Sequence, residues 1–144
     1  MNFGFMKGYS MDYKIIDIKT INTKNEGSLS FFQLHDDIDF DIKRIYYIYN
    51  ADSGVLRGKH AHKELKQILF CPYGSVQIKL DDGQRSETVS LSQPHIGLII
   101  GPSTWREMVW EIKDSVLCVA ASMKFDESDY IRNYNDFLKY VRGE

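Results

Sequence analysis

The sequence predicts an all-β domain, a barrel or sandwich of short strands, followed by one C-terminal α-helix. Two observations predict this class. Short runs rich in Ile, Val, Tyr and Phe alternate with turn signals along most of the chain, and only the tail has helical periodicity. The 144 residues are enough for one domain with a hydrophobic core. We expect a flexible N-terminal extension over residues 1–12 and a single domain over residues 13–144.

The strand-like runs contain the β-branched and aromatic residues that suit a half-buried, pleated surface. Turn signals such as Asn25-Glu26-Gly27 and Gly101-Pro102 separate them, and Asp82-Gly83 between two runs predicts a hairpin. Many short strands at this spacing favour a barrel or sandwich over a parallel sheet. The predicted strands are Tyr13–Ile18, Leu29–Leu34, Arg44–Tyr49, Lys66–Cys71, Ser75–Leu80, Thr88–Leu91, Ile96–Ile100, Thr104–Glu111 and Ser115–Ala121.

The tail differs from the rest of the chain because its apolar residues recur at helical spacing. A helix capped by Ser128 or Asp126 would place them on one face, which we expect to pack against the outside of the barrel. The residues of this face are Tyr130, Ile131, Tyr134, Phe137, Leu138 and Val141.

Charge and hydropathy exclude several classes of partner. The net charge of −2 provides no basic surface for a nucleic acid or an anionic membrane. No stretch approaches the roughly 18 apolar residues that span a bilayer. The two cysteines, Cys71 and Cys118, lie in apolar runs and are too few for a disulfide framework. We therefore expect a cytoplasmic protein that binds neither nucleic acid nor membrane.

The candidate chemistry lies in the segment Arg57-Gly58-Lys59-His60-Ala61-His62. Residues i and i+2 of a strand point to the same face, so His60 and His62 are expected to project together. A His-x-His pair alone is weak evidence, because two surface imidazoles give the same pattern. Here Gln67 and Gly74 follow at the spacing of the first cupin motif, in which a carboxylate and then a glycine follow the two histidines.

The segment from Pro94 to Arg106 resembles the second cupin motif, whose last position is histidine in metal-binding cupins. A cupin metal needs three imidazoles and a carboxylate. Here the neutral amide of Gln67 and the cation of Arg106 occupy two of these four places, and a guanidinium offers no lone pair. We therefore expect no metal and no other cofactor. Two imidazoles without a metal are free to move protons near neutral pH.

These segments together resemble the bacterial dTDP-4-keto-6-deoxyglucose 3,4-ketoisomerases, over about Tyr13 to Tyr140. The resemblance implies a metal-free cupin jelly roll that forms a homodimer. It also implies a place in deoxysugar synthesis, before a 3-aminotransferase, for a surface polysaccharide such as lipopolysaccharide or an S-layer glycan. The segments that carry it are Asp41 to Ile48, Arg57 to Lys63, Gly97-Leu98, Gly101-Pro102, Trp105 to Met108 and Ser128 to Tyr134.

The resemblance implies a reaction in which the carbonyl of dTDP-4-keto-6-deoxy-D-glucose moves from C4 to C3 through an enediol. His60 would remove the C3 proton, which the neighbouring carbonyl acidifies. His62 and Tyr46 would orient this base or polarise the oxygen where charge develops. The alternative for Tyr46 is a core aromatic residue, because three tyrosines crowd its run.

The diphosphate needs cations, and guanidinium groups suit it well. Arg57, Arg44 and Lys63 are the candidates, and for Arg44 and Lys63 a solvated surface charge is the alternative. Glu26 contributes if its turn reaches the site, and is otherwise a plain turn residue.

Gln67 and Arg106 are expected to contact the substrate in place of a metal. Some family members carry histidine at the position of Arg106 and others arginine, and the two side chains leave different room above C4. With arginine there, we expect a product that keeps the gluco configuration at C4.

Two other functions remain open. A dTDP-keto-sugar 3,5-epimerase has a similar fold, but it usually pairs its histidine with an aspartate, and no aspartate is spaced to orient His60. The second is a sugar-binding cupin module without enzymatic activity. Such modules are usually fused to a DNA-reading helical domain, and this chain has neither the length nor the basic charge for one.

Overall fold

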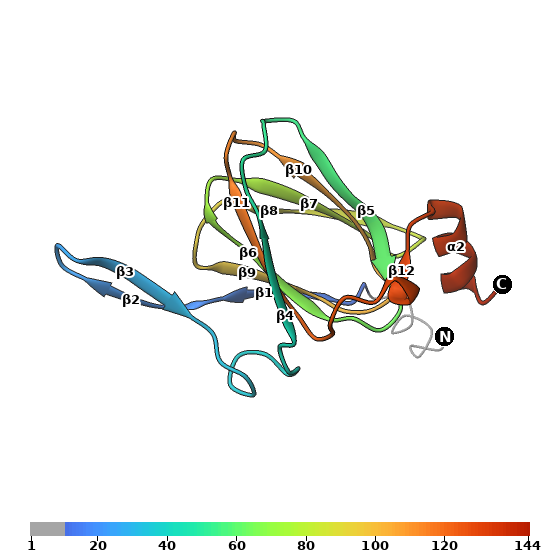
Figure 1. The fold of residues 1–144 in the computed structure, drawn as a ribbon, viewed down its shortest axis with the longest axis horizontal. Helices are drawn as coiled ribbons and strands as arrows, with labels where there is room; N and C mark the ends of the chain where they lie inside the picture. The colour runs from blue at the N-terminus through green and yellow to red at the C-terminus, as the bar shows by residue number, and fades with distance from the viewer. Residues whose placement is uncertain (1–10) are drawn as a thin grey trace, which may run out of the picture.

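Two five-stranded antiparallel sheets face each other in the computed structural model, which describes residues 11–144 (Figure 1). All strand pairings within the two sheets are antiparallel. The first sheet has the order β1 (Tyr13–Asp17), β9 (Ile96–Ile100), β6 (Gln67–Tyr73), β11 (Val116–Ala121) and β4 (Arg44–Ile48). The second has the order β12 (Tyr130–Ile131), β5 (Leu56–His62), β10 (Trp105–Trp110), β7 (Val76–Asp81) and β8 (Ser86–Leu91). The predicted all-β cupin jelly roll is confirmed.

The core lies between the two sheets and is built from alternate residues of their strands, as the two-residue period of a strand requires. Leu69, Leu98 and Val119 enter it from the first sheet, and Ile78 and Trp110 from the second; all five are fully buried. This continuous apolar core occupies one part of the space between the sheets, and the polar site described below occupies another.

A two-stranded hairpin projects from the body of the molecule (Figure 1). Its strands are β2 (Lys19–Thr23) and β3 (Gly27–Phe31), and every residue of both except Phe31 is exposed. Asn25 and Gly27, with φ of 64° and 91°, form the turn that the sequence predicts. The chain after this hairpin, residues 32–40, returns to cover the outer face of the first sheet with Ile38 and Phe40.

The C-terminal helix α2 (Tyr134–Arg142) packs on the outside of the second sheet, as predicted. Its fully buried Phe137 contacts a cluster that includes Ala61 and Trp105. Asn133 caps its first turn by accepting a hydrogen bond from the backbone N–H of Asp136 at 3.0 Å. This is the only α-helix in the described part of the chain, and no helix there is long and apolar enough to cross a membrane.

The predicted helix start is wrong. Tyr130 and Ile131 form β12, which pairs with His62 and Ala61 of β5, so backbone pairing to a neighbouring strand replaces helix formation there. Asp126, one of the two predicted caps, instead accepts a hydrogen bond from the backbone of Ser128 and begins the short 3₁₀-helix η1 (Glu127–Asp129).

Several boundaries also differ from the prediction. The strand predicted at Leu29–Leu34 runs from Gly27 to Phe31, and neither β2 nor β5 is among the predicted strands. Both missed strands are polar, β2 because it is exposed and β5 because it lines the site. Met11, which belongs to the predicted extension, is buried in the core. The rest of the predicted extension, residues 1–10, lies outside the described residues.

Candidate active site

A β-bulge in β5 aims the two histidines. Arg106 pairs with His60 and Glu107 pairs with Gly58, which leaves Lys59 as an extra residue between them. Gly58 and Lys59 have φ of 85° and 60°, and a Cβ on Gly58 would lie 3.1 Å from the carbonyl oxygen of Arg106. Glycine therefore suits this position on two counts, backbone conformation and space.

Beyond the bulge, His60 and His62 point to the same side of β5, as the sequence predicts. Their ring centroids are 4.9 Å apart and their planes nearly perpendicular. The two differ in access, since His60 is 9% exposed and His62 only 1%. His60 reaches an open cavity, whereas His62 lies behind it.

The cavity at His60 has a volume of about 300 Å³, enough for a sugar ring. Its walls come from β4, β5, β10 and β12, so both sheets contribute. It combines one imidazole and two tyrosines with three arginines, a local positive charge in a chain whose net charge is −2. The lining residues are Arg44, Tyr46, Ile48, Arg57, Gly58, His60, Met108, Tyr130 and Arg132.

His60 is neutral at physiological pH. Burial, and next the positive charge of Arg106, lower its pKa to about 4. A neutral imidazole at the wall of a cavity is able to accept a proton from a bound molecule. The site therefore offers a base, surrounded by cations that stabilise the anion which proton removal creates.

His62 is held by an aspartate. Its Nδ1 lies 2.9 Å from Oδ2 of Asp129, whose other oxygen accepts the backbone N–H of Glu64 at 2.8 Å. Burial, and next the positive charge of Arg106, lower the pKa of His62 far below its usual value, so the neutral ring donates its Nδ1–H to Asp129. The ring centroid of Tyr130, a cavity residue, lies 4.3 Å from that of His62. His62 and Asp129 thus support the wall that carries Tyr130.

Arg106, Gln67 and Tyr46 form a connected row. Arg106 is fully buried and donates from Nε and Nη2 to the carbonyl of Thr104 at 3.2 and 2.7 Å, and from Nη1 to Oε1 of Gln67. Nε2 of Gln67, also fully buried, donates to the hydroxyl of Tyr46 at 3.4 Å. Burial lowers the pKa of Arg106 to about 10, which leaves it a cation, and burial raises the pKa of Tyr46, which stays a neutral phenol.

Gln67 and Arg106 of this row are the residues that replace two of the four metal ligands of the cupin motifs. The donor set does not fit a divalent cation, because a buried guanidinium repels it and Gln67 already gives its oxygen to that guanidinium. Within residues 11–144, no three His, Cys, Asp or Glu side chains converge on one point. In this row the fixed positive charge is that of the buried Arg106.

Arg44 has unused hydrogen-bond donors. Its guanidinium lies over the rings of Tyr46 and Phe125, at 5.4 and 5.7 Å from their centroids. Its Nε and Nη2 are buried and have no hydrogen-bond partner in the described part of the chain. Buried donors of a permanent cation at a cavity wall favour an anionic ligand.

Comparisons with known proteins agree with this chemistry. The family model FdtA (WxcM-like, C-terminal) matches residues 11–142. The chain is 43% identical over 131 residues to a TDP-4-oxo-6-deoxy-alpha-D-glucose-3,4-oxoisomerase of Aneurinibacillus thermoaerophilus, covering 91% of this chain and 94% of that relative. The chain belongs to the FdtA family of sugar 3,4-ketoisomerases.

Solved structures of 3,4-ketoisomerases have the same fold. One from Helicobacter canadensis is 44% identical, with a TM-score of 0.89 and coverage of 92% of this chain and 99% of that one. QdtA from Thermoanaerobacterium thermosaccharolyticum, solved with TDP, is 42% identical, with a TM-score of 0.88 and coverage of 92% and 96%. The family resemblance and the enzyme class predicted from the sequence are confirmed.

Within this ketoisomerase, the predicted site residues fall into three groups. His60, Tyr46, Arg44 and Arg57 line the cavity. Behind it lie His62, Gln67 and Arg106, all at most 1% exposed. Lys63 and Glu26 do not line it: the first is exposed at the end of β5 and the second lies in the turn of the projecting hairpin.

Three residues of the ketoisomerase site are absent from the predicted set: Asp129, Tyr130 and Arg132. The ring of Tyr130 packs against both histidines, with its centroid 5.1 Å from that of His60 and 4.3 Å from that of His62. Arg132 lies 4.2 Å over the ring of Tyr130 and donates hydrogen bonds to Glu127 at 2.6 and 2.9 Å. All three belong to the segment Ser128 to Tyr134, which carries the family resemblance. The helical periodicity of that segment concealed their role.

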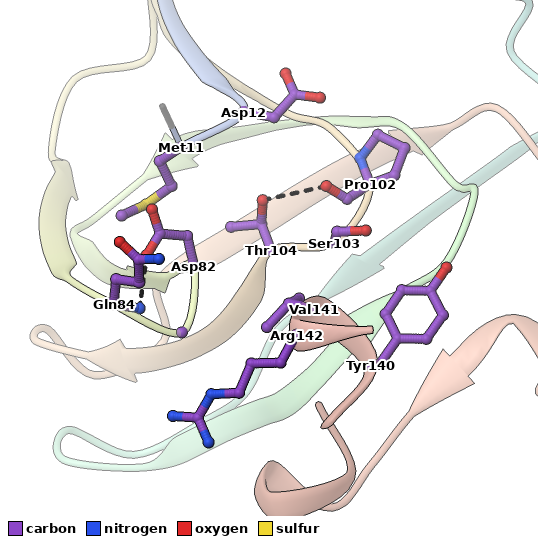
Figure 2. A pocket seen from close by; sticks show the side chains of 11 residues that line it. Met11, Asp12, Asp82, Gln84, Pro102, Ser103, Thr104, Tyr140, Val141 and Arg142 are labelled. Atoms are coloured by element: carbon purple, nitrogen blue, oxygen red, sulfur yellow. Dashed lines mark hydrogen bonds between the residues drawn. The ribbon is translucent and has the colours of Figure 1, made fainter. Parts of the chain in front are cut away.

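A larger hollow, of about 650 Å³, lies away from the ketoisomerase cavity. Figure 2 shows its wall, with Asp82 and Gln84 from the β7–β8 turn facing Tyr140 and Arg142 from α2. Its wall contains neither an imidazole nor a thiol, so choosing the active site by cavity volume alone would select the wrong cavity.

Proposed function

We propose that this enzyme converts dTDP-4-keto-6-deoxy-D-glucose into a dTDP-3-keto-6-deoxyhexose. The observation that carries the proposal is the placement of a neutral imidazole, His60, in a sugar-sized cavity that also holds three arginines. The names of the relatives, which are TDP-4-oxo-6-deoxyglucose oxoisomerase and sugar ketoisomerases, support the choice of substrate.

The reaction uses His60 as the base. The C4 carbonyl acidifies the C3 hydrogen, and His60 takes this proton while the C3–C4 double bond of an enediol forms. A proton then enters at C4, the C3 hydroxyl loses its proton, and the carbonyl stands at C3. No electron donor or acceptor is needed, because the sugar is oxidised at C3 and reduced at C4.

The arginines bind the diphosphate and stabilise the developing anion. Arg44 supports this role most directly, because two of its buried donors have no protein partner within residues 11–144. Arg57 and Arg132 add exposed cations to the same cavity. Lys63 follows His62 in the sequence and lies outside the cavity. It remains a candidate for binding the diphosphate.

The product keeps the gluco configuration at C4. A glucose ring carries its C3 and C4 hydrogens on opposite faces, so this outcome requires a proton delivered to C4 from the face opposite His60. Arg106 supports the assignment, because a guanidinium does not release a proton near neutral pH, whereas a histidine at this position would.

The test is NMR of the product formed from dTDP-4-keto-6-deoxy-D-glucose in deuterated water. We expect a 3-keto sugar whose C4 carries deuterium in the axial position, as the gluco configuration requires, and no label at C5. Label at C5 would indicate a 3,5-epimerase, and binding without turnover would indicate a sugar-binding module; either result contradicts the proposal.

We further infer a homodimer that acts in the cytoplasm. The exposed hairpin supports the dimer, because a two-stranded hairpin alone is marginally stable in water and gains from pairing with a second copy. Glu26, at the hairpin turn and outside the cavity of its own chain, keeps its predicted role only if the dimer brings it to the partner's cavity. A 3-keto product is the substrate that a 3-aminotransferase needs, which supports a place in amino-sugar synthesis for a surface polysaccharide.

A further inference from the structure

The donor and acceptor pattern around Gln67 has only one consistent solution. A guanidinium donates hydrogen bonds and accepts none, so the Gln67 atom facing Arg106 must be the amide oxygen. The amide nitrogen therefore faces Tyr46 and donates to its hydroxyl oxygen. Because both Gln67 and Arg106 are fully buried, solvent cannot reverse this orientation.

This pattern determines where the proton of Tyr46 points. The hydroxyl oxygen accepts from Gln67, so its own proton must be donated elsewhere. Within residues 11–144 it has no other hydrogen-bond partner, and Tyr46 lines the cavity. We propose that Gln67 is a positioning residue that fixes the hydroxyl of Tyr46 as the proton donor to the carbonyl oxygen at C4 of the sugar.

The inference rests on the proposed function and accounts for the protons on the two oxygens, while the C3 proton taken by His60 passes to solvent and the C4 proton comes from solvent. As His60 takes the C3 proton, the electron pair of the C3–H bond forms the C3–C4 double bond. The carbonyl pair moves to the C4 oxygen, which takes the proton of Tyr46. The resulting phenolate accepts a hydrogen bond from Gln67 and is stabilised by the charge of Arg106. Tyr46 regains a proton from the C3 hydroxyl when the carbonyl forms at C3.

The Gln67→Glu substitution distinguishes a positioning role of Gln67 from a purely structural one. Glutamate has the shape of glutamine, but both of its oxygens accept hydrogen bonds. In the Gln67→Glu enzyme one oxygen pairs with Arg106 and the other accepts the proton of Tyr46, which then no longer points into the cavity. The new carboxylate also neutralises a buried cation, and breaking or making such a pair changes stability strongly.

We therefore expect Gln67→Glu to lower kcat by about 10²-fold, the usual cost of losing one oxyanion donor, with little change in KM. The melting temperature should equal or exceed that of the wild type. Tyr46→Phe should lower kcat to a similar extent, and adding Gln67→Glu to it should cost little more, because the proton that Gln67 directs is already absent. Gln84→Glu, which adds a charge in the exposed β7–β8 loop, is the control and should match the wild type.

Three results would overturn the inference: a Gln67→Glu enzyme with nearly normal kcat, a loss of kcat that follows a fall in melting temperature, or losses that multiply in the double variant. A Tyr46→Phe enzyme with normal kcat would overturn it independently of any Gln67 variant. The proposed function fails in a different way, because then the wild type itself does not turn over the nucleotide sugar.

Discussion

At the scale of single residues, the site separates proton transfer from charge stabilisation. His60 is neutral because burial and Arg106 lower its pKa. The positive charge that stabilises the anion is carried by the surrounding arginines and not by His60. Sequence spacing alone predicts the histidine pair, Gln67 and Arg106, because each belongs to a short motif. It could not predict that Gln67 and Arg106 bond to each other across 39 residues, nor that Asp129 holds His62 across 67.

Replacing the base tests its assignment directly. His60→Asn retains a polar group of similar volume but loses proton affinity, so we expect turnover to fall by about 10²–10⁴-fold. Exchange of the C3 hydrogen with deuterated water should disappear with it, while dTDP binding by calorimetry should persist because the arginines remain. His95→Asn, a change outside the cavity, serves as control.

Two other outcomes would reassign His60. If C3 exchange continues while product formation stops, His60 serves the step at C4 and another group removes the C3 proton. If both continue at the normal rate, His60 only lines the cavity.

At the scale of elements, propensity and function compete. Strands of the apolar core were predicted well, because their alternation reflects burial on one side. The strand β5 was missed as an element: its residues face a polar site, and it contains a glycine bulge that strand propensity disfavours. The segment of β12 was misassigned because its apolar spacing suits a helix, while its pairing with β5 depends on a distant part of the chain.

The bulge in β5 should matter for both stability and catalysis. Gly58→Ala places a side chain at a positive φ, 3.1 Å from the carbonyl oxygen of Arg106, and should cost about 1–3 kcal/mol of the free energy of unfolding. It should also lower kcat by displacing His60. Gly54→Ala is a matched control, because its φ of 83° imposes similar backbone strain where no atom lies within 4 Å.

Thermal unfolding and steady-state kinetics of the two variants check this. We expect both to lose stability and only Gly58→Ala to lose kcat. Equal kcat values in the two enzymes would show that the bulge does not position the base.

At the scale of the whole molecule, two apolar features are exposed among residues 11–144. The projecting hairpin exposes Ile21 and Leu29, which face each other across its two strands and are 56% and 59% exposed. On the edge strand β4, Ile45 and Tyr47 are 67% and 61% exposed. Paired apolar residues on an exposed hairpin and an open sheet edge are features that association of two copies would cover.

The dimer proposal therefore predicts the mass of the protein in solution. It also predicts that Leu29 lies in the interface between the two copies. Light scattering at low micromolar concentration should give twice the chain mass of 16.8 kDa. Leu29→Asp should shift the enzyme toward the single-chain mass, because it buries a carboxylate at the interface. Ile112→Asp, at a residue 50% exposed in the β10–β11 loop, should leave the mass unchanged. A wild-type protein of single-chain mass would refute the dimer, and a Leu29→Asp protein that keeps the doubled mass would place the interface away from the hairpin.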